Sequence, residues 1–106
     1  MASHRGGLSA CALTPDATPD ATIVIEGRAF ASTVIVGAGE AVAFVNRDST
    51  RHTVTEGIGG QADYQTACVQ TRLDPHESTA VTFLQPGDYP ITCTIHAKMQ
   101  TIVHVR

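Results

Sequence analysis

Short runs of β-branched residues, each closed by turn-forming residues, recur along the chain from residue 22 to residue 105. Valine, isoleucine and threonine favour strands, and the glycine, proline and asparagine between the runs favour turns. No segment sustains the 3.6-residue apolar period of a helix. We expect strands at residues 23–25, 33–36, 41–45, 52–55, 79–84, 89–93 and 101–105. Short strands at this spacing predict an all-β sandwich or barrel.

Two local features refine this prediction. The sequence Gly-Asp-Tyr ends at Tyr89, four residues before Cys93, and is similar to the tyrosine corner of Greek-key sandwiches. Residues 57–72 show no clear period. We therefore expect a long loop there, with a short helix or an edge strand as the alternatives.

The first 21 residues do not share the strand pattern. From Thr14 the unit Thr-Pro-Asp-Ala repeats, and its prolines disfavour both helices and central strands. The sequence predicts a flexible N-terminal tail or linker at residues 1–21 and one domain at residues 22–106. A chain of 106 residues is long enough for a single domain with a modest core.

Charge and hydropathy argue against two classes of partner. The formal net charge is -3, and no basic stripe of the kind that binds nucleic acid is present. No apolar run approaches the ~18 residues of a membrane span. We expect a monomer that contacts neither nucleic acid nor the membrane interior.

Three metal-binding side chains stand at three-residue steps near the end of the chain: Cys93, His96 and Met99. A thiolate and a thioether hold Cu(I), and an imidazole also suits Cu(II). One more nitrogen would complete a His₂Cys plane with a weak axial methionine, the pattern of electron-transfer copper sites. His52, which precedes Cys93 by 41 residues, can supply it if the connection before His52 and the loop after Cys93 meet at one end of the fold. A backbone N–H near Asn46 or Thr94 is expected to bond the thiolate.

Three segments resemble the cupredoxin family, and within it the plastocyanin, amicyanin and pseudoazurin group: residues 42–54, 73–83 and 86–99. The short Cys-x-x-His-x-x-Met loop is similar to that of amicyanin and pseudoazurin. The resemblance implies a Greek-key β-sandwich of about eight strands and one type 1 copper ion held by His52, Cys93, His96 and Met99. The family often has proline next to the loop histidine, whereas Ile95 and Ala97 stand there in this chain.

This resemblance implies an electron carrier rather than an enzyme. The alternatives are a copper chaperone or storage protein, and a cupredoxin module cut from a larger redox enzyme. A carrier docks transiently with redox proteins. We expect docking near His96, where Arg51 and Lys98 would favour acidic partners.

With Cys93 assigned to copper, Cys11 and Cys68 remain. A disulfide between them, a lipid anchor at Cys11 and free thiols are all open. A disulfide would indicate an oxidising compartment. We therefore expect a periplasmic or extracellular protein. The N-terminus shows no apolar signal segment, and we expect that the export signal has been removed.

Overall fold

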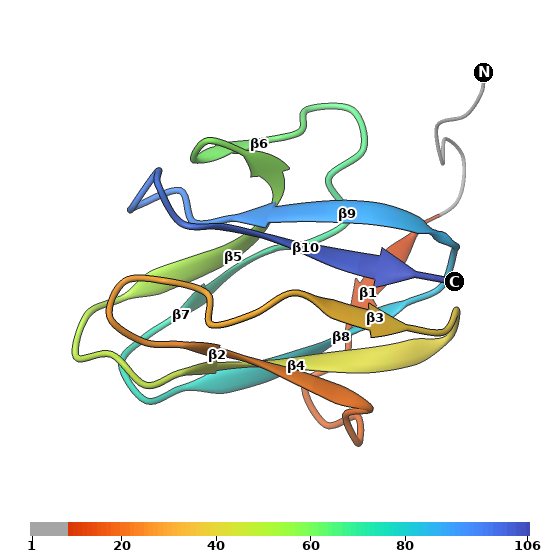
Figure 1. Ribbon diagram of the computed structural model, residues 1–106, viewed down its shortest axis with the longest axis horizontal. Helices are drawn as coiled ribbons and strands as arrows, with labels where there is room; N and C mark the ends of the chain where they lie inside the picture. Colours follow the sequence, from red (N-terminus) through yellow and green to blue (C-terminus); the bar gives the residue numbers. More distant parts are fainter. Residues whose placement is uncertain (1–8) are drawn as a thin grey trace.

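Two β-sheets form the fold, and the computed structural model describes it for residues 9–106 (Figure 1). The ten strands are β1 (Cys11–Leu13), β2 (Ala21–Ile25), β3 (Val34–Val36), β4 (Glu40–Asn46), β5 (His52–Ile58), β6 (Gln61–Ala62), β7 (Gln70–Leu73), β8 (Ser78–Phe83), β9 (Gly87–Thr92) and β10 (Gln100–Val105). No helix long and apolar enough to cross a bilayer occurs in this part of the chain.

The strand order is that of a sandwich. One sheet has the order β1-β8-β4-β2, and the other has the order β3-β10-β9-β5-β6, with β7 also paired to β5. The pairs β2–β4 and β3–β10 are parallel, and the remaining strand pairs are antiparallel. The prediction of an all-β sandwich is confirmed.

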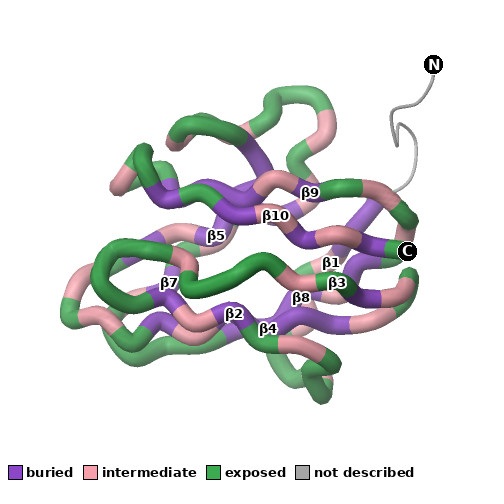
Figure 2. The backbone as a smooth tube through the Cα atoms, viewed as in Figure 1, coloured by how far each residue is buried: buried purple, intermediate pink, exposed green. Residues whose placement is uncertain are grey.

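Buried residues are interspersed with more exposed ones along the strands (Figure 2), and the buried apolar side chains form the core. In β10, for example, Thr101, Val103 and Val105 are buried, and Ile102 and His104 between them are partly exposed. Phe83 and Tyr89 meet edge to face with ring centroids 5.0 Å apart. The Tyr89 hydroxyl also donates to the carbonyl of Gln85 at 2.6 Å, so the expected tyrosine corner is present.

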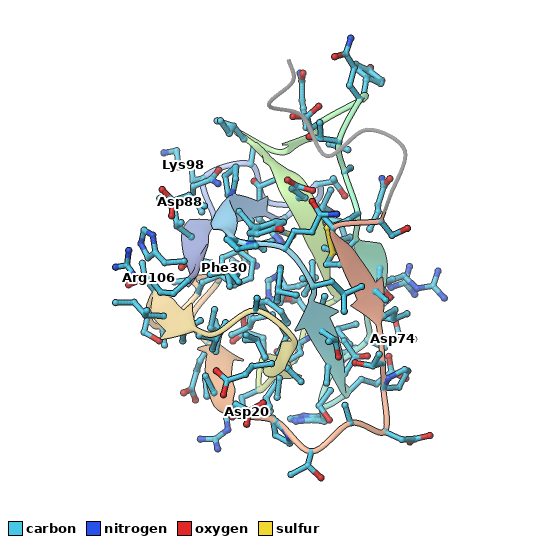
Figure 3. The ribbon with its side chains drawn as sticks, turned by 90° about the vertical axis from the view of Figure 1, so that its right-hand side faces the viewer. Asp20, Phe30, Asp74, Asp88, Lys98 and Arg106 are labelled. Carbon is cyan, nitrogen blue, oxygen red and sulfur yellow. A yellow bond between two sulfur atoms is a disulfide. The ribbon has the colours of Figure 1, made fainter. Side chains whose placement is uncertain are left out.

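The region expected to be a tail differs from that expectation. Residues 11–13 form β1, which pairs with β8 at the edge of a sheet. Cys11 is buried and forms a disulfide with Cys68, the sulfur–sulfur bond visible in Figure 3. The prolines did not prevent this strand, because they lie after it. Residues 1–8 of the expected tail lie outside the described residues.

The expected long loop at residues 57–72 contains two short strands. β6 pairs with the end of β5 through Gly57 and Ile58, and β7 pairs with its first half. Their sequence signal is weak because β6 has only two residues and β7 is half exposed. As a result, residues 52–55 of β5 pair with β7, and residues 55–56 pair with β9.

Three connections between strands lie at the same end of the sandwich. The β4–β5 connection, the β9–β10 connection and the segment after β2 all lie at the left end in Figure 1. The two termini of the described chain lie toward the opposite end. This arrangement brings segments that are distant in sequence to a common pole.

Candidate metal centre

His52, Cys93 and His96 meet at this pole. His52 is the first residue of β5, Cys93 directly follows β9, and His96 lies in the loop from Cys93 to Met99, hereafter the ligand loop. Each of the three offers a ligand atom, and these atoms lie within 4.8 Å of one another. The expected convergence of the two connections is therefore observed. In residues 9–106 no other group of three such donors occurs.

The three donor atoms form a nearly regular triangle. The two Nδ1 atoms are 3.2 Å apart, and Sγ of Cys93 lies 3.8 Å from Nδ1 of His52 and 4.0 Å from Nδ1 of His96. A point equidistant from these atoms lies about 2.1 Å from each, the circumradius of the triangle. Metal–nitrogen and metal–sulfur bonds of ~2.0–2.3 Å are typical of tight sites in proteins. The triangle thus has the size that a trigonal metal ion requires.

The surroundings of Cys93 favour its thiolate form. Its side chain is buried, and the backbone N–H of Thr53 donates to its sulfur at 3.3 Å. Burial alone would raise the pKa of Cys93. The Thr53 N–H, the His52 side chain and two backbone N–H groups of the ligand loop outweigh burial, and they lower the pKa of Cys93 from 9.0 to about 6. A thiolate at neutral pH is the form that binds metals.

His52 is oriented by a carboxylate. Its ring is fully buried, and Nε2 lies 2.7 Å from Oδ2 of Asp48. A proton on Nε2 satisfies this carboxylate and leaves the lone pair of Nδ1 facing Cys93 and His96. A carboxylate behind an imidazole fixes its tautomer and raises its basicity.

Asp48 is itself held in place by the segment after β2. Its two carboxylate oxygens accept the backbone N–H groups of Gly27 at 2.7 Å and Arg28 at 2.9 Å. Burial raises the pKa of Asp48, but these bonds and His52 together lower it below 3.8. Asp48 is therefore an anion at neutral pH, and it links the turn at Gly27–Arg28 to the buried imidazole.

His96 occupies the outer side of the triangle. It is partly exposed, and its ring lies against that of His52 with centroids 4.9 Å apart. A surface cavity of about 280 Å³ adjoins it, lined by Arg28, His96, Ala97, Lys98 and Met99. Nδ1 of His96 faces the other two donors, and the residue is partly exposed. His96 therefore connects the buried donors to the surface.

Met99 closes the ligand loop. It is 2% exposed, and its backbone N–H donates to the His96 carbonyl at 3.0 Å. The Met99 thioether is thus buried at the end of the loop that also carries Cys93 and His96. Its role as an axial ligand remains a prediction.

The sequence analysis missed two supporting residues. Asp48 stands four residues before His52, which is a signal that could have identified it. The sulfur of Cys93 accepts the N–H of Thr53 at 3.3 Å, which the sequence did not indicate, and the N–H groups of Ile95 and His96, which follow Thr94 as expected, also stabilise the thiolate. The Asn46 side-chain amide instead lies within hydrogen-bond distance of the carbonyls of Thr50, Leu73 and Asp74. The Thr94 N–H donates to the Thr53 hydroxyl at 2.8 Å, which ties the ligand loop to β5.

The chemistry of the donors matches their geometry. Two neutral imidazoles and one thiolate, with a buried thioether nearby, are soft and borderline ligands that suit copper in both of its common oxidation states. Hard ions such as Mg²⁺ and Ca²⁺ prefer oxygen donors, which this triangle lacks. The residues present therefore fit a copper ion.

Comparison with known proteins identifies similar structures but no similar sequences. No family model matches the chain, and no curated protein matches it. Among solved structures, amicyanin from Paracoccus versutus is 26% identical, with a TM-score of 0.76 over 93% of this chain and 100% of that one. A tyrosine-for-tryptophan variant of reduced amicyanin is 21% identical, with a TM-score of 0.75 over 92% of this chain and 99% of that one. These neighbours share the two-sheet architecture described above.

Proposed function

We propose that this chain, which has the cupredoxin fold, holds one type 1 copper ion and carries single electrons between redox proteins. The observation that supports this most directly is the triangle of one thiolate and two imidazoles, whose size and chemistry fit copper. Another similar structure, a methionine-to-alanine variant of amicyanin that is 20% identical to this chain, has been solved in a Cu(I) form. When bound, copper supplies a one-electron couple between Cu(I) and Cu(II).

Each residue of the chain has a separate task at this site. Cys93, as a thiolate, would hold the ion together with His52 and His96. Met99 would supply a weak thioether ligand. Asp48 and the Thr53 N–H hold His52 and Cys93 in place before the ion arrives, so little rearrangement accompanies binding or a change of oxidation state.

His96 is the exit for the electron. It is the one donor of the triangle that reaches the surface, and the exposed side chains of Ile95 and Ala97 flank it. A small apolar surface of this kind suits a transient encounter that buries little area. Redox partners dock here.

The charge around His96 favours acidic partners, but the residues differ from those expected. Arg51 pairs with Asp74 at 2.7 Å, and Asp74 also lies 3.7 Å from Arg72, so the charge of Arg51 is partly compensated. Arg28 and Lys98 line the cavity next to His96, and neither forms an ion pair within residues 9–106. Arg28 therefore replaces Arg51 in the docking hypothesis, and Lys98 keeps its role.

The cellular location follows from the cysteines. The Cys11–Cys68 disulfide is typical of an oxidising compartment, so the protein acts in the periplasm or outside the cell. A disulfide at Cys11 also occupies the sulfur that a lipid anchor would need. The protein works there as a monomer that meets its partners by diffusion.

Copper retention separates a carrier from a chaperone or store. The copper-loaded protein is cycled between ascorbate and ferricyanide in the presence of a Cu(I) chelator, and protein-bound copper is measured after each cycle. A carrier keeps its copper through repeated cycles, since a buried thiolate and two imidazoles hold both oxidation states. Transfer of copper to the chelator within the first reduction would support the chaperone alternative. Activity that requires a covalently joined enzyme domain would support an excised module.

A further inference from the structure

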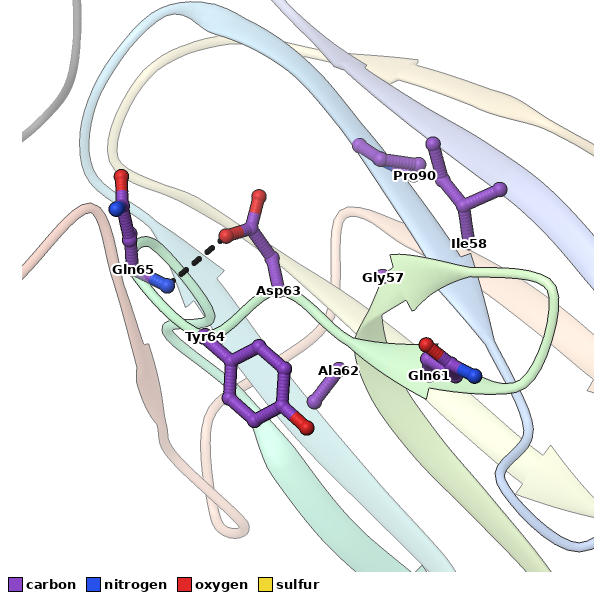
Figure 4. Close-up of a pocket in the computed structure, with 8 residues that line it drawn as sticks. All are labelled: Gly57, Ile58, Gln61, Ala62, Asp63, Tyr64, Gln65 and Pro90. Atoms are coloured by element: carbon purple, nitrogen blue, oxygen red, sulfur yellow. Dashed lines mark hydrogen bonds between the residues drawn. The ribbon is translucent and has the colours of Figure 1, made fainter.

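The turn between β5 and β6 lies directly against the ligand loop. A Cβ atom on Gly60 would stand 2.7 Å from Cβ and 2.9 Å from Cα of Ala97, the residue after His96. Carbon atoms reach their optimal contact only at ~3.5 Å. Glycine is therefore required at position 60 for this approach. Figure 4 shows the turn from the side of a surface pocket that Gly57, Ile58 and Pro90 line.

Thr92 connects this turn to the far end of the ligand loop. Its hydroxyl accepts the Gly60 N–H at 2.9 Å and donates to the Met99 carbonyl at 2.9 Å. Thr92 is fully buried; its bond to the Met99 carbonyl is buried, and its bond to Gly60 is partly buried. One side chain thus joins the turn to the last residue of the loop.

Gln100 makes a second connection. Its Oε1 accepts the Gly59 N–H at 3.0 Å, and its Nε2 donates to the Gly57 carbonyl at 3.0 Å. Gln100 follows Met99 directly and stands opposite Thr92 in the β9–β10 ladder. The residues that flank the ligand loop on both sides are therefore bonded to the same turn.

We infer that the turn at residues 57–60 is the positioning element of the ligand loop and sets, through Ala97, where His96 stands relative to Cys93 and His52. The ligand loop contains no proline to restrict its own backbone. Its shape is imposed from outside, by the Gly60–Ala97 contact and the bonds of Thr92 and Gln100. The positioning role is coupled to the copper site proposed above, but the turn and its contacts are formed by the protein alone.

Two neighbouring glycines provide a matched test of the contact. Gly59 and Gly60 both have positive φ, +63° and +85°, so an alanine is strained at either position. An added Cβ meets nothing within 4 Å at Gly59 but meets Ala97 at Gly60. In copper-loaded protein, Gly60→Ala is expected to change the copper hyperfine splitting and shift the reduction potential, whereas Gly59→Ala, whose added Cβ meets no atom within 4 Å, should change both far less. Equal spectra and potentials in the two variants would overturn the inference.

A second measurement needs no metal and no glycine substitution. In copper-free protein, Gln100→Ala removes both side-chain bonds to the turn. We expect the Met99 amide, which donates to the His96 carbonyl, to exchange with solvent about fivefold faster, the effect of losing roughly one hydrogen bond. Gln70→Ala, on the exposed side of β7, is the control and should leave this rate unchanged. An unchanged Met99 rate in Gln100→Ala would overturn the positioning role even if copper binds as proposed. A faster rate would support that role even if the protein binds no copper.

Discussion

Nε2 of His52 lies 2.7 Å from Oδ2 of Asp48, and this contact joins a fully buried imidazole to an anion. The same carboxylate accepts two backbone N–H groups from the turn at Gly27–Arg28. It therefore cannot move away from His52 without breaking those bonds. The negative charge behind His52 would stabilise the more positive oxidation state of an ion held by its Nδ1.

Asp48→Asn should raise the reduction potential of the copper-loaded protein. Removing the charge withdraws the stabilisation of Cu(II), and we expect a rise of about 60 mV, which equals a tenfold change in a one-electron equilibrium. The measurement is protein-film or solution voltammetry at one pH.

Asp88→Asn is the matched control for this change. Asp88 also contacts a histidine, His104, at 2.8 Å, but it lies at the start of β9, about 15–20 Å along that strand from Cys93. The control should leave the potential within a few millivolts of wild type. Similar shifts in both variants would mean that the effect comes from net charge and not from the contact with His52.

The Cys93 thiolate gives the copper-free protein a defined pH dependence. The folded pKa is about 6 and the unfolded value is 9.0, so the folded state favours the thiolate. This group's contribution to stability is fully present above pH 9 and is lost as the pH falls through 6. Thiolate absorbance near 240 nm should therefore rise with a midpoint near pH 6 in copper-free protein and be absent from Cys93→Ser. A midpoint near 9 would contradict the stabilising role of the Thr53 N–H.

The disulfide should stabilise the fold without shaping the copper site. Cys11 and Cys68 are 57 residues apart in sequence, and closing a loop of this length typically contributes 2–4 kcal/mol, with about 4 from chain entropy alone. A Cys11→Ser, Cys68→Ser double variant should lose about 3 kcal/mol in urea unfolding. Its copper spectrum should match wild type, because β1 lies away from the pole that holds the donors. A changed spectrum would show that the disulfide also acts on the site.

Charge reversal tests the docking surface. Arg28→Glu and Lys98→Glu should each slow electron exchange with an acidic redox protein at low salt and flatten its salt dependence, since both cations are unpaired next to His96. Arg51→Glu should have the smaller effect, because Asp74 already partly compensates this charge. Stopped-flow rates between about 10 mM and 300 mM salt provide the comparison. If Arg51→Glu has the largest effect, the original assignment of Arg51 is restored.

The candidate ligands could be proposed from the sequence because their chemistry is local. Cys93, His96 and Met99 fall within one loop between two strands, and the alternating pattern placed those strands. His52 followed from the requirement for one more nitrogen at the start of a strand. The four positions therefore depend on composition and spacing, which a sequence displays directly.

The contacts that support the candidate ligands could not be predicted from the sequence, because they depend on tertiary geometry. The Thr53 N–H reaches the Cys93 sulfur because β5 and β9 are adjacent, and Arg28, whose backbone N–H donates to Asp48, lines the cavity beside His96. The strand at residues 11–13 likewise exists because β8 offers an edge and Cys68 a partner. No periodicity in those three residues indicates this pairing.

The visible and EPR spectra after addition of one equivalent of Cu(II) test the central claim most directly, with Cys93→Ser as the comparison. If His52, Cys93 and His96 bind copper in one plane, wild type shows an intense thiolate-to-copper absorption band and a narrow copper hyperfine splitting. Both signals are absent from Cys93→Ser. A pale Cu(II) spectrum with a wide splitting in wild type would show that the donors do not bind copper in this geometry, and it would contradict the account.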